Sequence, residues 1–151
     1  ELEEFYSSYF TPNCPVSVDI ETKGRIITCI GFAPSPERVL VVPFFSETEA
    51  DGSYWRSLEA ERTAWEFVRR ILQSHPSFGQ NFQYDMQYLW REAAIPCPRF
   101  CDDTMLMHHA LQPEMQKGLG FLASIYTDEQ AWKFMHKVRS DDRNAKKGDQ
   151  E

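Results

Sequence analysis

Two carboxylates separated by one residue, in the segment Asp19-Ile20-Glu21, are the first candidates for chemistry. Side chains alternate between apolar and polar from Val16 to Ile20, which predicts a β-strand. Residues i and i+2 of a strand project from the same face, so Asp19 and Glu21 would point the same way. Two such carboxylates repel each other unless a cation lies between them, and oxygen ligands suit Mg²⁺ or Mn²⁺. Taken alone, the pattern also fits a solvated strand end.

The segment Gln80–Asp85 (QNFQYD) is the second candidate, because it lies where a short strand is expected to pass into a helix. Polar side chains at such a junction can line a site at the end of a sheet. Asn81 could cap the helix, and Asp85, four residues later, would lie on the same side. By itself the segment equally fits a capped helix with an acidic first turn.

Alternating elements must position these residues. Strands that form an antiparallel meander are expected over 16–20, 25–33 and 38–45. The rest of the chain alternates helices with short strands: helices over 58–72, 82–94, 103–111 and 118–126, and strands over 77–80 and 99–101. Asp103 is expected to cap the helix that follows it. The order predicts an α/β, three-layer domain with a mixed sheet, in which an antiparallel meander is followed by parallel strands and flanked by helices.

Composition bounds the functions that are possible. A chain of 151 residues with 42% hydrophobic residues is long and apolar enough for one folded domain. We expect that domain to span residues 1–132, followed by a polar tail over 133–151. The formal net charge of −7 excludes a protein that coats phosphates with basic residues. If the chain handles nucleic acid, a bound metal is the obvious local source of positive charge.

The sequence also carries expectations about its setting. It has no apolar run of the ~20 residues that cross a bilayer, and its first residues lack the features of a signal peptide. Its four cysteines do not make a disulfide scaffold, so we expect them to be reduced. These features predict an intracellular, non-secreted protein without a membrane partner, cytoplasmic if bacterial or phage. The missing initiator Met indicates a piece of a longer chain.

Taken together, the two candidate segments resemble the DEDD (DnaQ-like) 3′–5′ exonuclease superfamily, which has an RNase H-like fold. Asp19–Thr22 looks like its first motif and Asn81–Asp85 like its second. Two later segments, Asp103–His109 and Lys117–Ala123, are similar to the proofreading domains of family A, bacteriophage-type DNA polymerases. The resemblance covers roughly Val16–Tyr126, and the order and spacing of its motifs agree.

The resemblance implies hydrolysis of terminal phosphodiesters with two divalent cations, Mg²⁺ or Mn²⁺. Asp19 would bridge both ions, Glu21 would ligate the ion that activates a water, and Asp85 would act on the second ion through water. All three would therefore be catalytic and metal-binding residues.

The resemblance also implies a substrate and a partner. Thr22, Asn81 and Tyr84 would bind the terminal nucleotide of a single-stranded DNA 3′ end, with RNA possible, and the product would be a nucleoside 5′-monophosphate. The polymerase domain of a parent chain would be the partner, and the protein would be a monomer.

One part of the family pattern is missing. The family has a third motif with a further Asp, preceded by Tyr at four residues or His at five, and no Tyr version follows Tyr126. The His version occurs once, from His136 to Asp141, in polar surroundings that indicate a chance match. We therefore expect a domain truncated before its third motif, weakly active or inactive alone. Two alternatives stay open: a non-catalytic module that binds nucleic acid or a partner, and a stand-alone RNA or DNA exonuclease.

Overall fold

The structure, a computed structural model, describes residues 1–129. They belong to two compact units, residues 1–104 and the chain from Met105 onward. The predicted polar tail over 133–151 and the segment from His136 to Asp141 lie outside the described residues.

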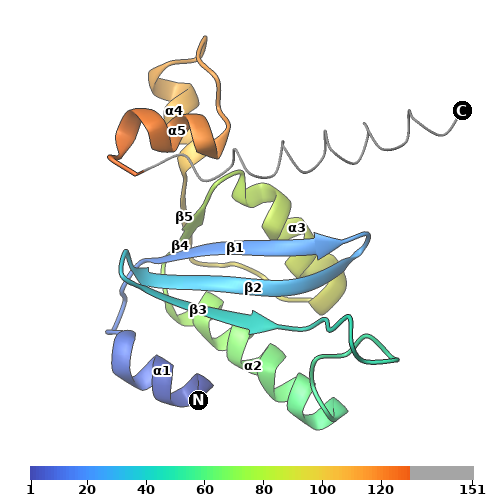
Figure 1. Ribbon diagram of the computed structural model, residues 1–151. Helices are drawn as coiled ribbons and strands as arrows, with labels where there is room; N and C mark the ends of the chain where they lie inside the picture. Colours follow the sequence, from blue (N-terminus) through green and yellow to red (C-terminus); the bar gives the residue numbers. More distant parts are fainter. Residues whose placement is uncertain (130–151) are drawn as a thin grey trace, which may run out of the picture. The chain divides into compact units, whose positions relative to one another are not determined.

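The first unit is built on a five-stranded sheet with the strand order β3-β2-β1-β4-β5 (Figure 1). The strands are β1 (Val16–Lys23), β2 (Ile26–Ser35), β3 (Arg38–Pro43), β4 (Ser77–Gly79) and β5 (Phe100–Asp103). β1, β2 and β3 pair antiparallel, whereas β4 pairs in parallel with β1 and β5. The α/β class and the mixed sheet predicted from the sequence are confirmed.

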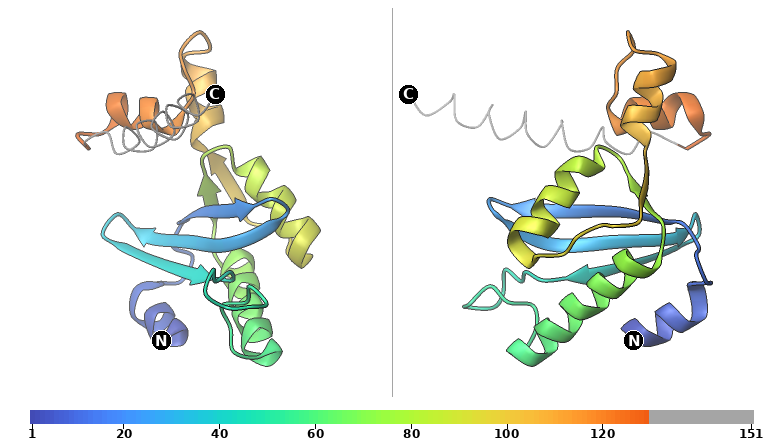
Figure 2. Two further views of the ribbon diagram at one scale, coloured as in Figure 1. Left: turned by 45° about the vertical axis from the view of Figure 1, so that its right-hand side comes forward. Right: turned by 180° about the vertical axis from the view of Figure 1, so that it is seen from behind.

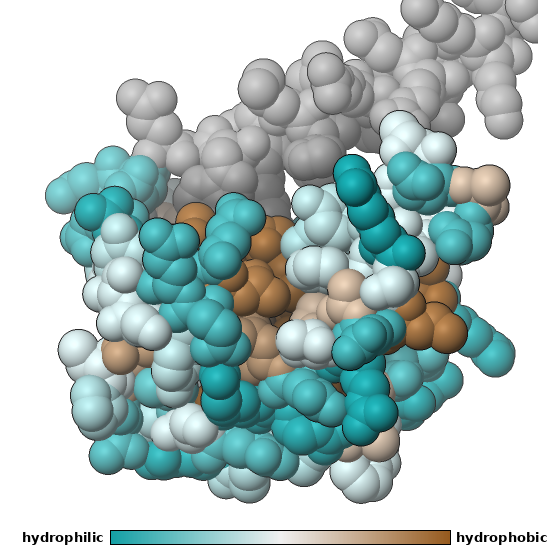
Figure 3. Space-filling model, turned by 90° about the horizontal axis from the view of Figure 1, so that it is seen from below, coloured by the Kyte–Doolittle hydropathy of each residue, from teal (hydrophilic) through white to brown (hydrophobic). Residues whose placement is uncertain are grey.

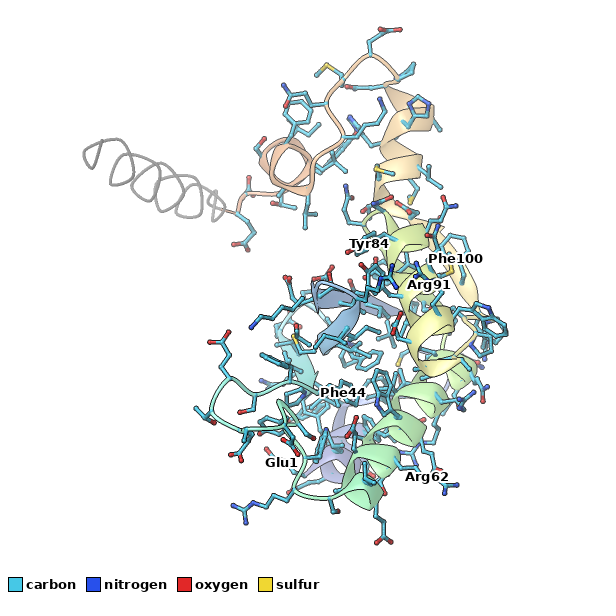
Figure 4. All side chains as sticks on the ribbon, turned by 90° about the vertical axis from the view of Figure 1, so that its right-hand side faces the viewer. Glu1, Phe44, Arg62, Tyr84, Arg91 and Phe100 are labelled. Atoms are coloured by element: carbon cyan, nitrogen blue, oxygen red, sulfur yellow. The ribbon has the colours of Figure 1, made fainter. Side chains whose placement is uncertain are left out.

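Three helices of this unit lie on one face of the sheet: α1 (Leu2–Tyr9), α2 (Leu58–Ser74) and α3 (Phe82–Ala93) (Figure 2). The core forms between this face and the helices. Phe44, for example, lies between the sheet and α2 and stacks on Trp65 at 3.7 Å between ring centroids (Figure 4). The strands bury every second side chain here, and the helices bury the apolar side chains of one face. The core includes Val18, Ile20, Ile30, Phe32, Val42, Val68, Leu72, Phe82 and Leu89.

The strand residues between these core positions point to the opposite face. Asp19 and Glu21 of β1 are exposed there, as are Val39 and Val41 of β3. No helix of the first unit covers this face (Figures 1 and 2). Alternation along β1 thus separates the apolar side chains that hold the fold from the acidic side chains available for chemistry.

The remaining described elements are short. In the second unit, α4 (Thr104–Leu111) continues from the boundary and α5 (Leu119–Tyr126) follows, with His108 Nδ1 and the Tyr126 hydroxyl 2.9 Å apart. Among the described residues, no helix is long and apolar enough to cross a membrane. Seen from below, the surface is mainly hydrophilic, with apolar atoms visible between the polar side chains (Figure 3).

Each strand ends one to three residues away from the predicted position: β2 continues to Ser35, β4 stops at Gly79 and β5 continues to Asp103. β1 continues to Lys23 rather than ending at Ile20, because its polar end pairs with β2 across the hairpin. β3 ends at Pro43 rather than residue 45. Pairing with a neighbour, and not the alternation of side chains, decides where these strands stop.

Gly79 lies where β4 meets both β1 and α3, and it has no room for a side chain. A Cβ at this position would lie 2.8 Å from the Val18 carbonyl oxygen and 2.9 Å from a ring carbon of Phe82. Gly79→Ala should therefore lower the free energy of unfolding by about 1–3 kcal/mol, measured by urea denaturation.

Gly31→Ala is the matched control, because its Cβ would meet only the Asp19 carbonyl oxygen at 3.7 Å. It should change stability by less than about 0.5 kcal/mol. Equal effects of the two substitutions would contradict the close approach at Gly79.

Candidate active site

Asp19 and Glu21 project from β1 onto the face of the sheet that the helices of the first unit leave free. They line a shallow hollow of about 280 Å³. The hollow is completed by small and apolar side chains of the three antiparallel strands: Ser17, Cys29, Gly31, Ala33, Val39 and Val41. The two carboxylates therefore share one accessible surface, as the strand period predicted.

A β-bulge lies directly beside this pair. Glu21 pairs with Cys29 but Thr22 pairs with Ile27, so Thr28 is the extra residue on β2. The Thr28 hydroxyl donates to the Glu21 carbonyl oxygen at 3.0 Å and holds the irregularity in place. A bulge bends its strand, and this one lies on β2 beside the end of the Asp19–Glu21 segment.

Asp85 reaches the same stretch of β1 from the first turn of α3. Its Oδ1 accepts a hydrogen bond of 2.9 Å from the backbone N–H of Ile20, the residue between Asp19 and Glu21. This is possible because β4 pairs with β1 only at Val16 and Ser17, which leaves the later amides on that edge of β1 without a strand partner. Asp85 takes the place of the missing strand and is only 4% exposed.

The surroundings of Asp85 oppose its ionisation. Burial raises the pKa of its carboxyl group to about 6, and the negative charges of Asp19 and Asp103 add to the rise, although the Ile20 amide acts in the opposite direction. Asp85 in turn helps burial to raise the pKa of the Cys97 thiol to about 11. The carboxyl group is thus buried and also exposed to the negative charge of two other acidic residues.

The donor set fits a hard divalent cation. Carboxylate oxygens are the ligands that Mg²⁺ and Mn²⁺ prefer, and a cation would offset both the burial and the repulsion that raise the pKa of Asp85. Within residues 1–129, however, no three His, Cys, Asp or Glu side chains are already placed as a metal-binding group. The structure brings Asp85 to the backbone between Asp19 and Glu21, and the metal-ligand role of the three stays a prediction.

Two of the predicted substrate-binding residues contact each other. The Thr22 hydroxyl at the end of β1 and the Tyr84 hydroxyl on α3 are 3.0 Å apart. The Tyr84 ring, labelled in Figure 4, lies 4.8 Å from the ring of Tyr88, whose hydroxyl donates to the Gly24 carbonyl oxygen at 3.1 Å. These contacts tie α3 to the β1–β2 hairpin beside Glu21, and Tyr84 keeps 43% of its surface exposed.

The predicted cap of α3 by Asn81 is wrong. Asn81 has the left-handed conformation, with φ 56° and ψ 42°, and its side chain makes no capping hydrogen bond. The carboxylate of Asp103 caps this helix instead, accepting from the amides of Asn81 at 3.0 Å and Phe82 at 2.7 Å. Sequence reasoning missed this contact because Asp103 immediately precedes α4, where an acidic residue reads as a local cap.

The elevated pKa of Asp85 predicts how stability depends on pH without divalent cations. Its folded pKa of about 6 exceeds the ordinary value of 3.8 for an aspartate, so the native state holds the proton more tightly. Stability should fall as pH rises from about 4 through 6. Asp85→Asn keeps an oxygen for the Ile20 amide and removes the charge, so at pH 7 it should raise the free energy of unfolding by about 1–3 kcal/mol.

Denaturant unfolding in EDTA at pH 4 and pH 7 measures this effect, and the gain should largely vanish at pH 4. Asp102→Asn is the matched control, because Asp102 is an exposed carboxyl group on the same strand as Asp103. A gain of equal size at both pH values, or a loss at pH 7, would show that burial does not raise the pKa of Asp85.

Comparison with known proteins agrees with this geometry. A family model described as 3′–5′ exonuclease, of the DNA polymerase A type, matches residues 1–147. No curated protein matches the chain significantly. The family match covers the sheet, the three acidic residues and both described units, and extends beyond the range 16–126 in which the motifs are found. The chain therefore belongs to the 3′–5′ exonuclease domain family of family A DNA polymerases.

Proposed function

We propose that this chain is the proofreading 3′–5′ exonuclease domain of a DNA polymerase, and that it uses two divalent cations to hydrolyse the last phosphodiester of a single-stranded DNA 3′ end. The observation that carries the proposal is the hydrogen bond from the Ile20 amide to Asp85. It joins the first and second motifs at the one backbone position that lies between Asp19 and Glu21.

The positions of the acidic residues support the roles proposed for them. Asp19 and Glu21 are exposed on the open face of the sheet and line one hollow, where, as the family resemblance implies, Asp19 would ligate both cations and Glu21 one of them. Asp85 is buried, and one of its oxygens is engaged by the Ile20 amide, which suits a ligand that acts through water. Bound divalent cations would supply positive charge to the phosphate and lower the pKa of a water.

The reaction is a hydrolysis. The oxygen of water forms a bond to the terminal phosphorus, the bond from phosphorus to the 3′ oxygen of the preceding nucleotide breaks, and that oxygen takes up a proton. The products are a nucleoside 5′-monophosphate and a shortened strand with a new 3′ hydroxyl. Cations also explain how a chain with a net charge of −7 can bind a polyanion.

The substrate end would be held beside the carboxylates. Thr22 and Tyr84 are joined at the end of β1, next to Glu21, and Tyr84 is exposed enough to contact a nucleotide. Asn81 is exposed at the start of α3, four residues before Asp85. A single strand is the expected substrate, since a paired end would first have to be unstacked. We propose a polymerase domain as the partner and a monomeric, intracellular protein.

The three carboxylates are fewer than the family pattern provides. We propose that the 151-residue chain by itself binds cations weakly and hydrolyses DNA slowly, and that Asp141 does not supply the fourth carboxylate. The missing third motif also favours a second candidate function, a non-catalytic module that holds nucleic acid or a partner.

Cation binding and hydrolysis can be tested on the same samples. The chain should be stabilised against heat by Mn²⁺, because a ligand that binds only the native state raises its stability. It should also shorten a 5′-labelled single-stranded DNA from its 3′ end. Asp19→Ala should remove the Mn²⁺ stabilisation and lower the cleavage rate roughly 100-fold or more.

Glu66→Gln is the control, because it removes an exposed carboxylate on α2 whose ion pair with Arg62 is worth little. It should leave both measurements unchanged. Equal cleavage by the chain and by Asp19→Ala would refute the catalytic assignment. DNA binding without Mn²⁺ stabilisation or cleavage would identify the non-catalytic module, and rapid cleavage lost in Asp141→Asn would identify Asp141 as the fourth carboxylate.

A further inference from the structure

Asp85 must be held at one place if it is to act together with Asp19 and Glu21. It lies in the first turn of α3, so its position depends on where that helix begins. The hydrogen bond to the Ile20 amide shows the result of this placement, with 2.9 Å between Oδ1 and the nitrogen. A small shift of the start of α3 would lengthen that bond, and hydrogen bonds weaken steeply when their geometry is lost.

The start of α3 is fixed by a residue from another strand. Asp103, at the end of β5, is 4% exposed and accepts from the Asn81 amide at 3.0 Å and the Phe82 amide at 2.7 Å. A charged acceptor makes strong bonds to amides and is favoured at the positive end of a helix. The left-handed Asn81 offers no side-chain cap, so α3 depends on this distant carboxylate.

Asp103 is itself firmly placed. β5 pairs with β4 so that Asp103 lies opposite Gly79. The next residue, Thr104, donates from its hydroxyl to the Gly79 carbonyl oxygen at 3.3 Å and also contacts the Gln80 side chain. Gly79 in turn lies so close to β1 and Phe82 that a Cβ would not fit. A continuous chain of contacts therefore runs from β5 through the start of α3 to Asp85 and β1.

We propose that Asp103 is a positioning residue for the exonuclease site: by capping α3 from β5, it holds Asp85 against the backbone between Asp19 and Glu21. Its relevance to catalysis rests on the proposed function, but the placement of Asp85 does not. Asp103 acts on the site by placing Asp85 and is not itself a catalytic residue.

The test compares two helix caps in the full chain. Asp103→Asn keeps the shape of the side chain but replaces one acceptor oxygen by a donor, so it cannot accept from both amides. Ser57→Ala is the matched control, because the Ser57 hydroxyl accepts from the Ala60 amide at 3.2 Å and caps α2, which carries none of the three carboxylates. Both substitutions remove a cap and should lower thermal stability to a comparable extent.

The first measurement is hydrogen exchange of the Ile20 amide by NMR, without cations. In Asp103→Asn it should exchange at least about tenfold faster relative to the core amides of Ile30 and Phe32, whereas Ser57→Ala should leave this ratio unchanged. The second is Mn²⁺ affinity, which should weaken roughly tenfold in Asp103→Asn alone. An Ile20 amide that exchanges no faster relative to the core than in Ser57→Ala overturns the proposal.

The two proposals fail in different ways. If the wild-type chain binds no Mn²⁺ at the carboxylates, the proposed function fails, while the exchange of Ile20 still decides whether Asp103 places Asp85. If Asp103→Asn does not fold, Thr104→Val takes its place, because it loosens the attachment of β5 to Gly79 and leaves the Asp103 carboxylate intact. Selective acceleration of Ile20 in Thr104→Val then supports the proposal, and an unchanged ratio overturns it.

Discussion

A buried carboxylate that completes an open strand edge is the constraint on which the site depends. Asp85 accepts from the amide of Ile20 at a point of β1 that β4 is too short to reach. The contact satisfies a backbone donor that burial would otherwise leave costly, but it also removes a carboxyl group from water next to Asp19. The arrangement therefore costs stability at neutral pH, because it holds a buried carboxyl group against the strand that carries Asp19 and Glu21. A protein that retains such a cost at one place is expected to use it for function.

The sheet explains why this place exists. The antiparallel hairpin makes β1 long, whereas the parallel strand β4 ends after three residues and turns into α3. The chain therefore leaves the sheet beside the middle of β1, and the first turn of the helix arrives where Asp19 and Glu21 emerge on the other face. Asp103 caps the start of α3, and the bulge interrupts the pairing of β1 with β2 directly after Glu21. The two features lie on the two edges of β1. Secondary structure brings the parts near, and two irregular features set their final positions.

The net charge of the whole chain has the same sign as the charge of the site. The chain is acidic overall, and the pKa of Asp85 is raised mainly by burial and further by the negative charges of Asp19 and Asp103. Membership of an exonuclease family assigns a substrate that is also an anion. These facts are compatible when cations mediate between protein and phosphate, because the residues that repel each other in their absence are the ones that would bind them. Under the proposed function, the unfavourable electrostatics of the site would become its means of binding cations and, through them, the substrate.

The sequence by itself determined the elements whose signal is local. Alternation along β1 placed Asp19 and Glu21 on one face, and the order of strands and helices predicted the mixed sheet, because both patterns repeat over neighbouring residues. Only the tertiary structure decided which groups meet. Asp85 bonds to an amide 65 positions away and Asp103 caps a helix 21 positions away, although in the sequence each reads as an ordinary acidic residue at the start of its own helix. Periodicity carries no record of such pairs, since a hydrogen bond between distant segments is chosen by the packing of the whole sheet and not by the residues beside it.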